Sequence, residues 1–218
     1  MSYNTSTDIL PPPCHGFTLD ANRLTEEMAR RGTPIILPEP PLVFTSLTPR
    51  GNANLVVLHS QQGHDYPMGL DIYSVHHECR IPKPYGRGWA GIGYHIWVEL
   101  APPAGQPQAM FARPPWAIGA ANLGVNSTAI SICVGGDARN RPWTTLEVAI
   151  IQHLLCSLAD ASRIPLMWCY HRDLLTCDTN CPGKYAPSPA ELSSGPTLPP
   201  YGPSKYPNLF RHATAKPR

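Results

Sequence analysis

The sequence predicts an α/β protein with one folded domain between two proline-rich arms. Segments with the patterns of strands and helices alternate through the middle of the chain, and 42% of the 218 residues are apolar, which is enough to bury one core. The 27 prolines concentrate before Pro41 and after Pro187, where they favour extended chain. We therefore expect an arm over residues 1–50, a folded domain over residues 51–185 and a proline-rich tail over residues 186–218.

The N-terminal arm contains one expected helix. Asp20 is a typical N-cap, ANRLTEEMARR follows it, and Gly32 is a typical helix stop. The segments on both sides are broken by proline and are expected to be extended. The arm either packs on the core or docks the protein on a larger assembly.

The domain begins with an expected strand over residues 54–58. NLVVL is a short apolar run, typical of a central strand buried on both faces. It ends directly before His59, and ligand sites in α/β sheets gather at the carboxyl ends of strands. A helix is expected over residues 67–79, with Pro67 in its first turn.

Further strands and one long helix are expected downstream. Residues 92–100 are rich in β-branched and aromatic side chains, which predicts a strand, and residues 108–114 are expected to pair with it in antiparallel fashion. Residues 128–134 predict another strand. Residues 142–161 place apolar side chains at helical spacing, which predicts an amphipathic helix.

Charge and targeting patterns exclude several classes of protein. The formal net charge is only +2 and shows no clustered basic face, so we expect no nucleic-acid partner. No apolar run approaches the roughly 18 residues of a membrane span, so we expect no membrane insertion. The N-terminus lacks the basic start and apolar stretch of a signal peptide, which predicts that the protein is made in the cytoplasm.

Two histidines and one cysteine form the candidate metal site. His59, His171 and Cys181 together offer two imidazoles and a thiolate, a donor set that suits a catalytic zinc ion with water in the fourth position. They come from separate segments, so spacing alone does not bring them together, and a histidine after a strand is more often a polar strand end. Among the seven cysteines, only Cys177 and Cys181 have neighbours that suggest chemistry.

Four ordered blocks connect this site to a known family. They are NLVVLHS, GWAGIGYHIWVE, ARPPWAIGAANLGVNSTAISICVGGD and HRDLLTCDTNCPG. Their order and spacing resemble those of the zinc N-acetylmuramoyl-L-alanine amidases, which include phage lysozyme-type amidases and the peptidoglycan recognition proteins. The resemblance covers about residues 50–185.

The resemblance implies a fold, a reaction and a set of site residues. The expected fold is a mixed sheet of about five strands flanked by helices, with Zn²⁺ in a groove on one face. The expected reaction is hydrolysis of the amide between N-acetylmuramic acid and the L-alanine of the stem peptide in bacterial peptidoglycan. Its zinc ligands fall on His59, His171 and Cys181, its catalytic tyrosine falls on Tyr94, and a transition-state donor falls on Thr179.

The chain departs from the family pattern at two places. The gap between the two downstream ligands is usually seven residues, whereas here it is nine and contains Cys177. Cys181 is the preferred ligand because Pro182 and Gly183 follow it, and Cys177 stays open as a substitute. Ala120 stands where many relatives have a histidine, which is expected to alter peptide recognition without affecting the metal.

Three further residues are candidates for contact with the substrate. Trp89 could stack on a sugar face, although burial in the core is equally compatible with its sequence context. Arg113 and Asn126 could contact stem-peptide carboxylates or amides, with structural roles in loops as the alternative. His95 is expected to pack or to form hydrogen bonds beneath the sheet.

These observations predict a peptidoglycan-cleaving enzyme of phage origin. The absence of a secretion signal favours an endolysin or a lysin carried on the virion, and the proline-rich arms are candidates for contacts with virion proteins. The alternatives are a module that binds peptidoglycan without cutting it, and a structural virion component with a vestigial amidase fold.

Overall fold

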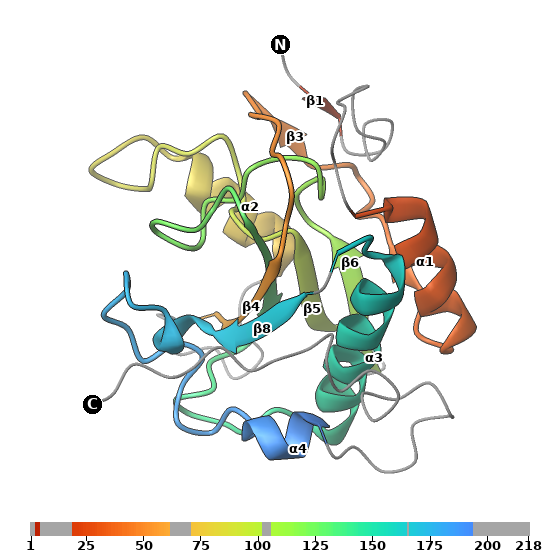
Figure 1. Ribbon diagram of the computed structural model, residues 1–218. Helices are drawn as coiled ribbons and strands as arrows, with labels where there is room; N and C mark the ends of the chain where they lie inside the picture. The colour runs from red at the N-terminus through yellow and green to blue at the C-terminus, as the bar shows by residue number, and fades with distance from the viewer. Residues whose placement is uncertain (1–2, 5–18, 62–70, 102–105, 165, 194–218) are drawn as a thin grey trace.

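A six-stranded mixed sheet forms the centre of the protein, as the computed structural model in Figure 1 shows. The structure describes residues 3–4, 19–61, 71–101, 106–164 and 166–193. The strands, in their order across the sheet, are β2 (Ile35–Ile36), β6 (Gln106–Phe111), β5 (Ile96–Ala101), β7 (Ala129–Val134), β4 (Leu55–Ser60) and β8 (Met167–Tyr170). The predicted α/β class with one mixed sheet is therefore confirmed, and β2 from the N-terminal arm adds a strand to the expected five or so.

Parallel pairing dominates the half of the sheet that contains β4. This strand lies between β7 and β8 and is parallel to both, and all six of its residues are buried, as the apolar run predicts. On the other side, β5 is parallel to β7 and antiparallel to β6. The antiparallel pair expected from the sequence is thus confirmed.

Helices cover both faces of the sheet. Figure 1 shows α1 (Ala21–Arg30) beside α3 (Thr145–Ala161) on one side and α2 (Ile72–Arg80) on the other. Successive side chains of β4 point to opposite faces of the sheet. Val56 and Leu58 point to the face covered by α1 and α3, where they belong to the main core cluster. The opposite face packs Trp97 and Cys133 against α2, and it is the face toward which His59 points by the same alternation.

Capping side chains set where the helices begin. The Asp20 carboxylate accepts hydrogen bonds from the N–H groups of Asn22 and Arg23, so the predicted cap of α1 is confirmed. Thr144 and Glu147 form a capping box, so α3 begins at Thr145 rather than at residue 142. The expected start of α2 at residue 67 was also wrong, because a capping residue places it further along the chain.

Asp71 is the N-cap of α2. Its carboxylate accepts the N–H of Ser74 at 2.7 Å, and its own backbone is extended, so the helix begins at Ile72. Pro67, the expected first-turn residue, lies outside the described residues.

Both arms contribute to the folded core where the structure describes them. Leu24 and Met28 of α1 and Ile35 of β2 belong to the main core cluster, so the described part of the N-terminal arm packs on the core. Nearby, β1 (Tyr3–Asn4) pairs with β3 (Val43–Phe44). The expected extended tail contains α4 (Pro189–Ser193), whose Leu192 is 1% exposed. Residues 5–18 and 194–218 lie outside the described part.

None of the helices in the described ranges combines the length and the apolar character needed to cross a membrane.

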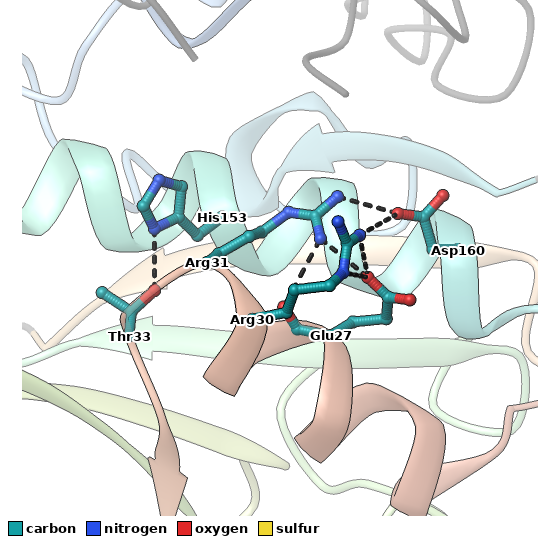
Figure 2. Close-up of polar contacts among 6 residues, drawn as sticks. All are labelled: Glu27, Arg30, Arg31, Thr33, His153 and Asp160. Carbon is teal, nitrogen blue, oxygen red and sulfur yellow. Dashed lines mark hydrogen bonds and ion pairs between the residues drawn. The ribbon is translucent and has the colours of Figure 1, made fainter. Parts of the chain in front are cut away.

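A polar network joins α1 to α3, as Figure 2 shows. The Arg31 guanidinium lies 2.8 Å from a Glu27 oxygen and 2.7 Å from Asp160 Oδ2, and its side chain is only 5% exposed. The Thr33 hydroxyl lies 2.7 Å from His153 Nδ1. These contacts attach the arm to the longest helix of the domain.

We expect Arg31→Met to lower the free energy of unfolding by about 1–3 kcal/mol, because it removes the more buried of the two guanidinium groups that contact Glu27 and Asp160. Arg30→Ala is the matched control. That side chain is 46% exposed, and its loss should cost about 0.5 kcal/mol or less. Urea unfolding measures both, and equal midpoints for the two variants would contradict the assignment.

Candidate active site

The strand register brings the two candidate histidines together. Leu58 of β4 is the Cα partner of Tyr170 of β8, and the strands are parallel. His59 is the next residue of β4 and His171 directly follows the end of β8, so both lie at the same edge of the sheet. Their ring centroids are 4.5 Å apart. Two residues 112 positions apart in the sequence therefore become neighbours through backbone pairing alone.

The loop after η1 (His171–Asp173) places the third candidate, Cys181. The Cys181 carbonyl accepts the N–H of Arg172 at 2.8 Å, and the Ser60 hydroxyl donates to the carbonyl of Pro182. Gly183 has a φ of +119°, and a Cβ at this position would lie 2.5 Å from the Ala138 carbonyl carbon. Only glycine fits this approach, which explains the glycine that follows the cysteine and proline.

The three side chains form a potential metal-binding group. One donor atom from each of His59, His171 and Cys181 lies within 4.8 Å of the other two. Cys181 Sγ is 3.6 Å from His59 Nδ1, close to the separation of about 3.6 Å that Zn–S and Zn–N bonds of about 2.3 and 2.05 Å impose in a tetrahedron. The donor types and their spacing therefore fit a zinc ion.

The second ring nitrogen of His59 has its own partner. His59 Nε2 lies 2.9 Å from Asn122 Oδ1, and the Asn122 amide donates to the Ser131 hydroxyl at 2.6 Å. With a proton on Nε2, His59 is left with an unprotonated Nδ1 that faces Cys181. A hydrogen bond of this kind orients histidine ligands at metal sites. Sequence reasoning missed Asn122, for which the only signal is an asparagine in a glycine-rich loop.

Burial keeps the donor group uncharged. Burial and the neighbouring His171 lower the pKa of His59 well below 6.5, and burial also lowers the pKa of His171. Burial raises the pKa of the Cys181 thiol to about 12. The imidazoles are therefore ready to bind a metal at neutral pH, whereas the thiol must release a proton when it does so.

A pocket opens beside this group and includes the two expected catalytic residues. The Tyr94 ring lies 5.0 Å from the His59 ring, centroid to centroid, and burial raises the pKa of Tyr94 well above 10, so its hydroxyl stays protonated. The Thr179 hydroxyl accepts the N–H of Cys181 at 3.1 Å. The described lining consists of His59, Ser60, Gln61, Val75, Glu78, Cys79, Arg87, Trp89, Tyr94, Ala120, Ala121, His171, Thr179 and Cys181.

The three expected substrate contacts occupy different places. Trp89 lies on the pocket wall, with the Arg87 guanidinium 4.8 Å above its ring. Arg113 is 5% exposed and donates to two backbone carbonyls, at 2.9 and 2.8 Å. Asn126 accepts the N–H groups of residues 121 and 122 and so shapes the loop. Neither Arg113 nor Asn126 is among the described lining residues, and substrate contact by all three stays a prediction.

His95 is fully buried directly before the start of β5. Its Nδ1 accepts the N–H of Ser131 at 2.9 Å, and its Nε2 lies 3.0 Å from the carbonyl of Ala117. The hydrogen-bonded role expected from the sequence is therefore confirmed.

The fold and the site together define a class of protein. Three protein donors that leave a fourth position open are typical of catalytic metal sites, and here they lie at the carboxyl edge of an α/β sheet beside a pocket. The Amidase_2 family, described as N-acetylmuramoyl-L-alanine amidase, matches residues 49–184. The match covers more than half of the chain, so the protein belongs to this family and is an N-acetylmuramoyl-L-alanine amidase.

Solved structures share this fold. The endolysin N-acetylmuramoyl-L-alanine amidase LysCS from Clostridium intestinale URNW is 26% identical, with a TM-score of 0.53 over 69% of this chain and 87% of that one. The Ph2119 endolysin from a Thermus scotoductus bacteriophage is 22% identical, with a TM-score of 0.55 over 68% and 88%. A mutant of Drosophila PGRP-LB in complex with tracheal cytotoxin is 19% identical, with a TM-score of 0.55 over 78% and 92%. A comparison with curated protein sequences gave no match.

We expect the metal-free protein to lose stability as the pH falls from 7.5 to 5.5. Burial lowers the pKa values of His59 and His95 well below 6.5, so below about pH 6.5 the unfolded chain binds protons that the folded chain excludes. Each such histidine contributes a slope of up to about 1.4 kcal/mol per pH unit. Urea unfolding in the presence of a chelator measures the slope.

The exposed His77 provides the control for this experiment. His77→Gln should leave the slope unchanged, whereas His95→Gln should reduce it. A midpoint that does not move between pH 7.5 and 5.5 would show that these rings are not held neutral by burial.

Proposed function

We propose that this amidase cleaves the bond between N-acetylmuramic acid and the L-alanine of the stem peptide with a zinc ion held by His59, His171 and Cys181. The observation that supports this most strongly is the convergence of three donor side chains within 4.8 Å of one another in a chain of the amidase family. The type of bond that is cleaved is inferred from the family, and the use of a metal ion for hydrolysis is inferred from the donor group.

A zinc ion bound here would lower the pKa of a water molecule towards about 7 and polarise the scissile carbonyl. The protein's own contribution begins with the tautomer of His59, whose Nε2–H points to Asn122 and leaves Nδ1 available. The Cys181 thiolate would add one negative charge to the otherwise neutral donor group. Among the described residues, the potential metal-binding group consists of these three side chains, all of which line the pocket.

Tyr94 and Thr179 are proposed to act on the reacting groups. The protonated Tyr94 hydroxyl can orient the attacking water or donate to the oxyanion that forms on the carbonyl. The Thr179 oxygen already accepts the Cys181 N–H, so its own proton is free to be donated to the same oxyanion. Both act as neutral donors, and neither has to ionise during the reaction.

The proposed substrate is bacterial peptidoglycan, bound along the pocket wall. Trp89 offers an aromatic surface to a sugar or peptide face. Arg87 and Glu78 place charges of both signs in the pocket lining, which suits a stem peptide with carboxylate and amide groups. Arg113 and Asn126 would support this wall through the backbone groups they bind.

The similarity to LysCS, an endolysin amidase, supports a role as a phage endolysin that acts at the cell wall. A virion-associated lysin, held by its arms to other virion proteins, is the alternative placement.

Zinc content and release of stem peptides from sacculi, assayed on the same preparations, test the proposal. The wild type should hold one zinc per chain and release stem peptides. Cys181→Ser should lose most of both, because a neutral hydroxyl is a poor replacement for a thiolate. Tyr94→Phe should keep its zinc and lose about 10²–10³-fold in kcat, the usual effect of removing an oxyanion donor.

Thr25→Val, a substitution on the far face in α1, is a control that should change neither quantity. Wild-type protein that binds no zinc and releases no peptide would contradict the proposal and favour a module that binds peptidoglycan.

A further inference from the structure

A second thiol lies beside the proposed ligand His171. Cys177 Sγ is 3.2 Å from His171 Nε2, whereas the donor group within 4.8 Å contains Cys181 and not Cys177. Cys177 is partly buried and outside the pocket lining. The thiol therefore contacts a ring nitrogen of His171 without belonging to the donor group.

The Cys177 thiol also contacts the glycine-rich loop over residues 119–128. Its sulfur lies 4.0 Å from the Leu123 carbonyl, within reach of a weak S–H donation. The adjacent Thr176 hydroxyl donates to the same carbonyl at 2.6 Å. Gly124 has a φ of +83°, and a Cβ there would lie 2.9 Å from Thr176 Cγ2. The two loops therefore pack closely at this point.

The same glycine-rich loop holds the other histidine. Asn122 precedes Leu123, and its Oδ1 lies 2.9 Å from His59 Nε2. Both candidate histidine ligands are thus contacted at Nε2. Asn122 of the loop contacts His59 directly, whereas His171 contacts Cys177, which in turn contacts the loop. A histidine with its proton on Nε2 has only Nδ1 left to bind a metal.

We propose that Cys177 is a positioning residue, which accepts the Nε2–H of His171 and so fixes the tautomer and the ring orientation that this ligand needs. Together with Asn122, it makes residues 119–128 a common support for both histidine ligands. The inference rests on the zinc site proposed above. It excludes Cys177 as a zinc ligand, the alternative that the sequence left open.

Two substitutions separate the hydrogen bond from simple packing. Cys177→Ala removes the acceptor, and Cys177→Ser restores a polar acceptor at the same position. We expect Cys177→Ala to weaken zinc binding about tenfold, in the range found when a partner of a ligand histidine is removed, and Cys177→Ser to stay within about threefold of the wild type. Leu175→Ala is the control, because this side chain belongs to the same loop, is 72% exposed and should leave both the thiol and His171 unchanged.

Two spectroscopic readouts do not depend on activity. In the metal-free wild type, ¹⁵N NMR should find His171 in the Nε2–H tautomer, and Cys177→Ala should shift it toward a mixture. In cobalt-substituted protein, the thiolate-to-cobalt charge-transfer absorption should persist in both Cys177 variants and disappear in Cys181→Ser. Thermal unfolding of the metal-free variants shows whether each variant is folded. If Cys177→Ala does not fold, the tautomer and the absorption spectrum of Cys177→Ser test the inference.

Each contrary result has a distinct meaning. An unchanged tautomer and unchanged zinc affinity in Cys177→Ala would reduce the thiol to a packing role and overturn the inference. Loss of the charge-transfer absorption in Cys177→Ser would make Cys177 a ligand and overturn it as well. If the wild type binds no zinc, the proposed function fails, whereas the tautomer measured in the metal-free protein still decides the role of Cys177.

Discussion

The parallel pairing of β4 with β8 is the constraint on which the site depends. The register sets Leu58 opposite Tyr170, so His59, the next residue of β4, and His171, the first residue after β8, lie at the same edge of the sheet. Burial of β4 on both sides fixes this register, because a slip by one residue would turn His59 into the core under α3. The third donor needs only a loop that returns to the strand ends, and Ser60 and Arg172 hold that loop in place.

Burial and hydrogen bonding act together on the donor group. Burial holds the imidazoles neutral, and Asn122 fixes which nitrogen of His59 is exposed to the metal position. The same burial raises the pKa of the Cys181 thiol to about 12, so a metal ion would have to displace its proton. The donor side chains therefore converge without a bound ion, and the proposed zinc would bind to an arrangement that already exists. The loop that contains Asn122 contacts His59, and the loop that follows η1 positions Cys181.

The sequence predicted the elements with strong local signals and missed those set by tertiary contacts. The apolar run before His59 and the Asp20 cap were sufficient to place β4 and α1. By contrast, β2 has two residues, too few for a periodic pattern, and forms because β6 offers it a parallel edge. The helix α4 lies in a proline-rich segment and packs on α3; its start is capped by Ser188 and Glu191, a local signal that the sequence analysis did not use. Hydrogen-bond partners such as Asn122 depend on loop conformation, which spacing along the chain does not reveal.

The central claim is that two imidazoles and one thiolate hold a zinc ion in this pocket. X-ray absorption spectroscopy at the zinc edge of the wild-type protein tests it directly, because sulfur and nitrogen or oxygen ligands differ in bond length and scattering. The structure predicts one sulfur ligand at about 2.3 Å and the remaining ligands, nitrogen and oxygen, at about 2.0–2.1 Å. A shell with two sulfur atoms, or with none, would contradict the assignment of His59, His171 and Cys181.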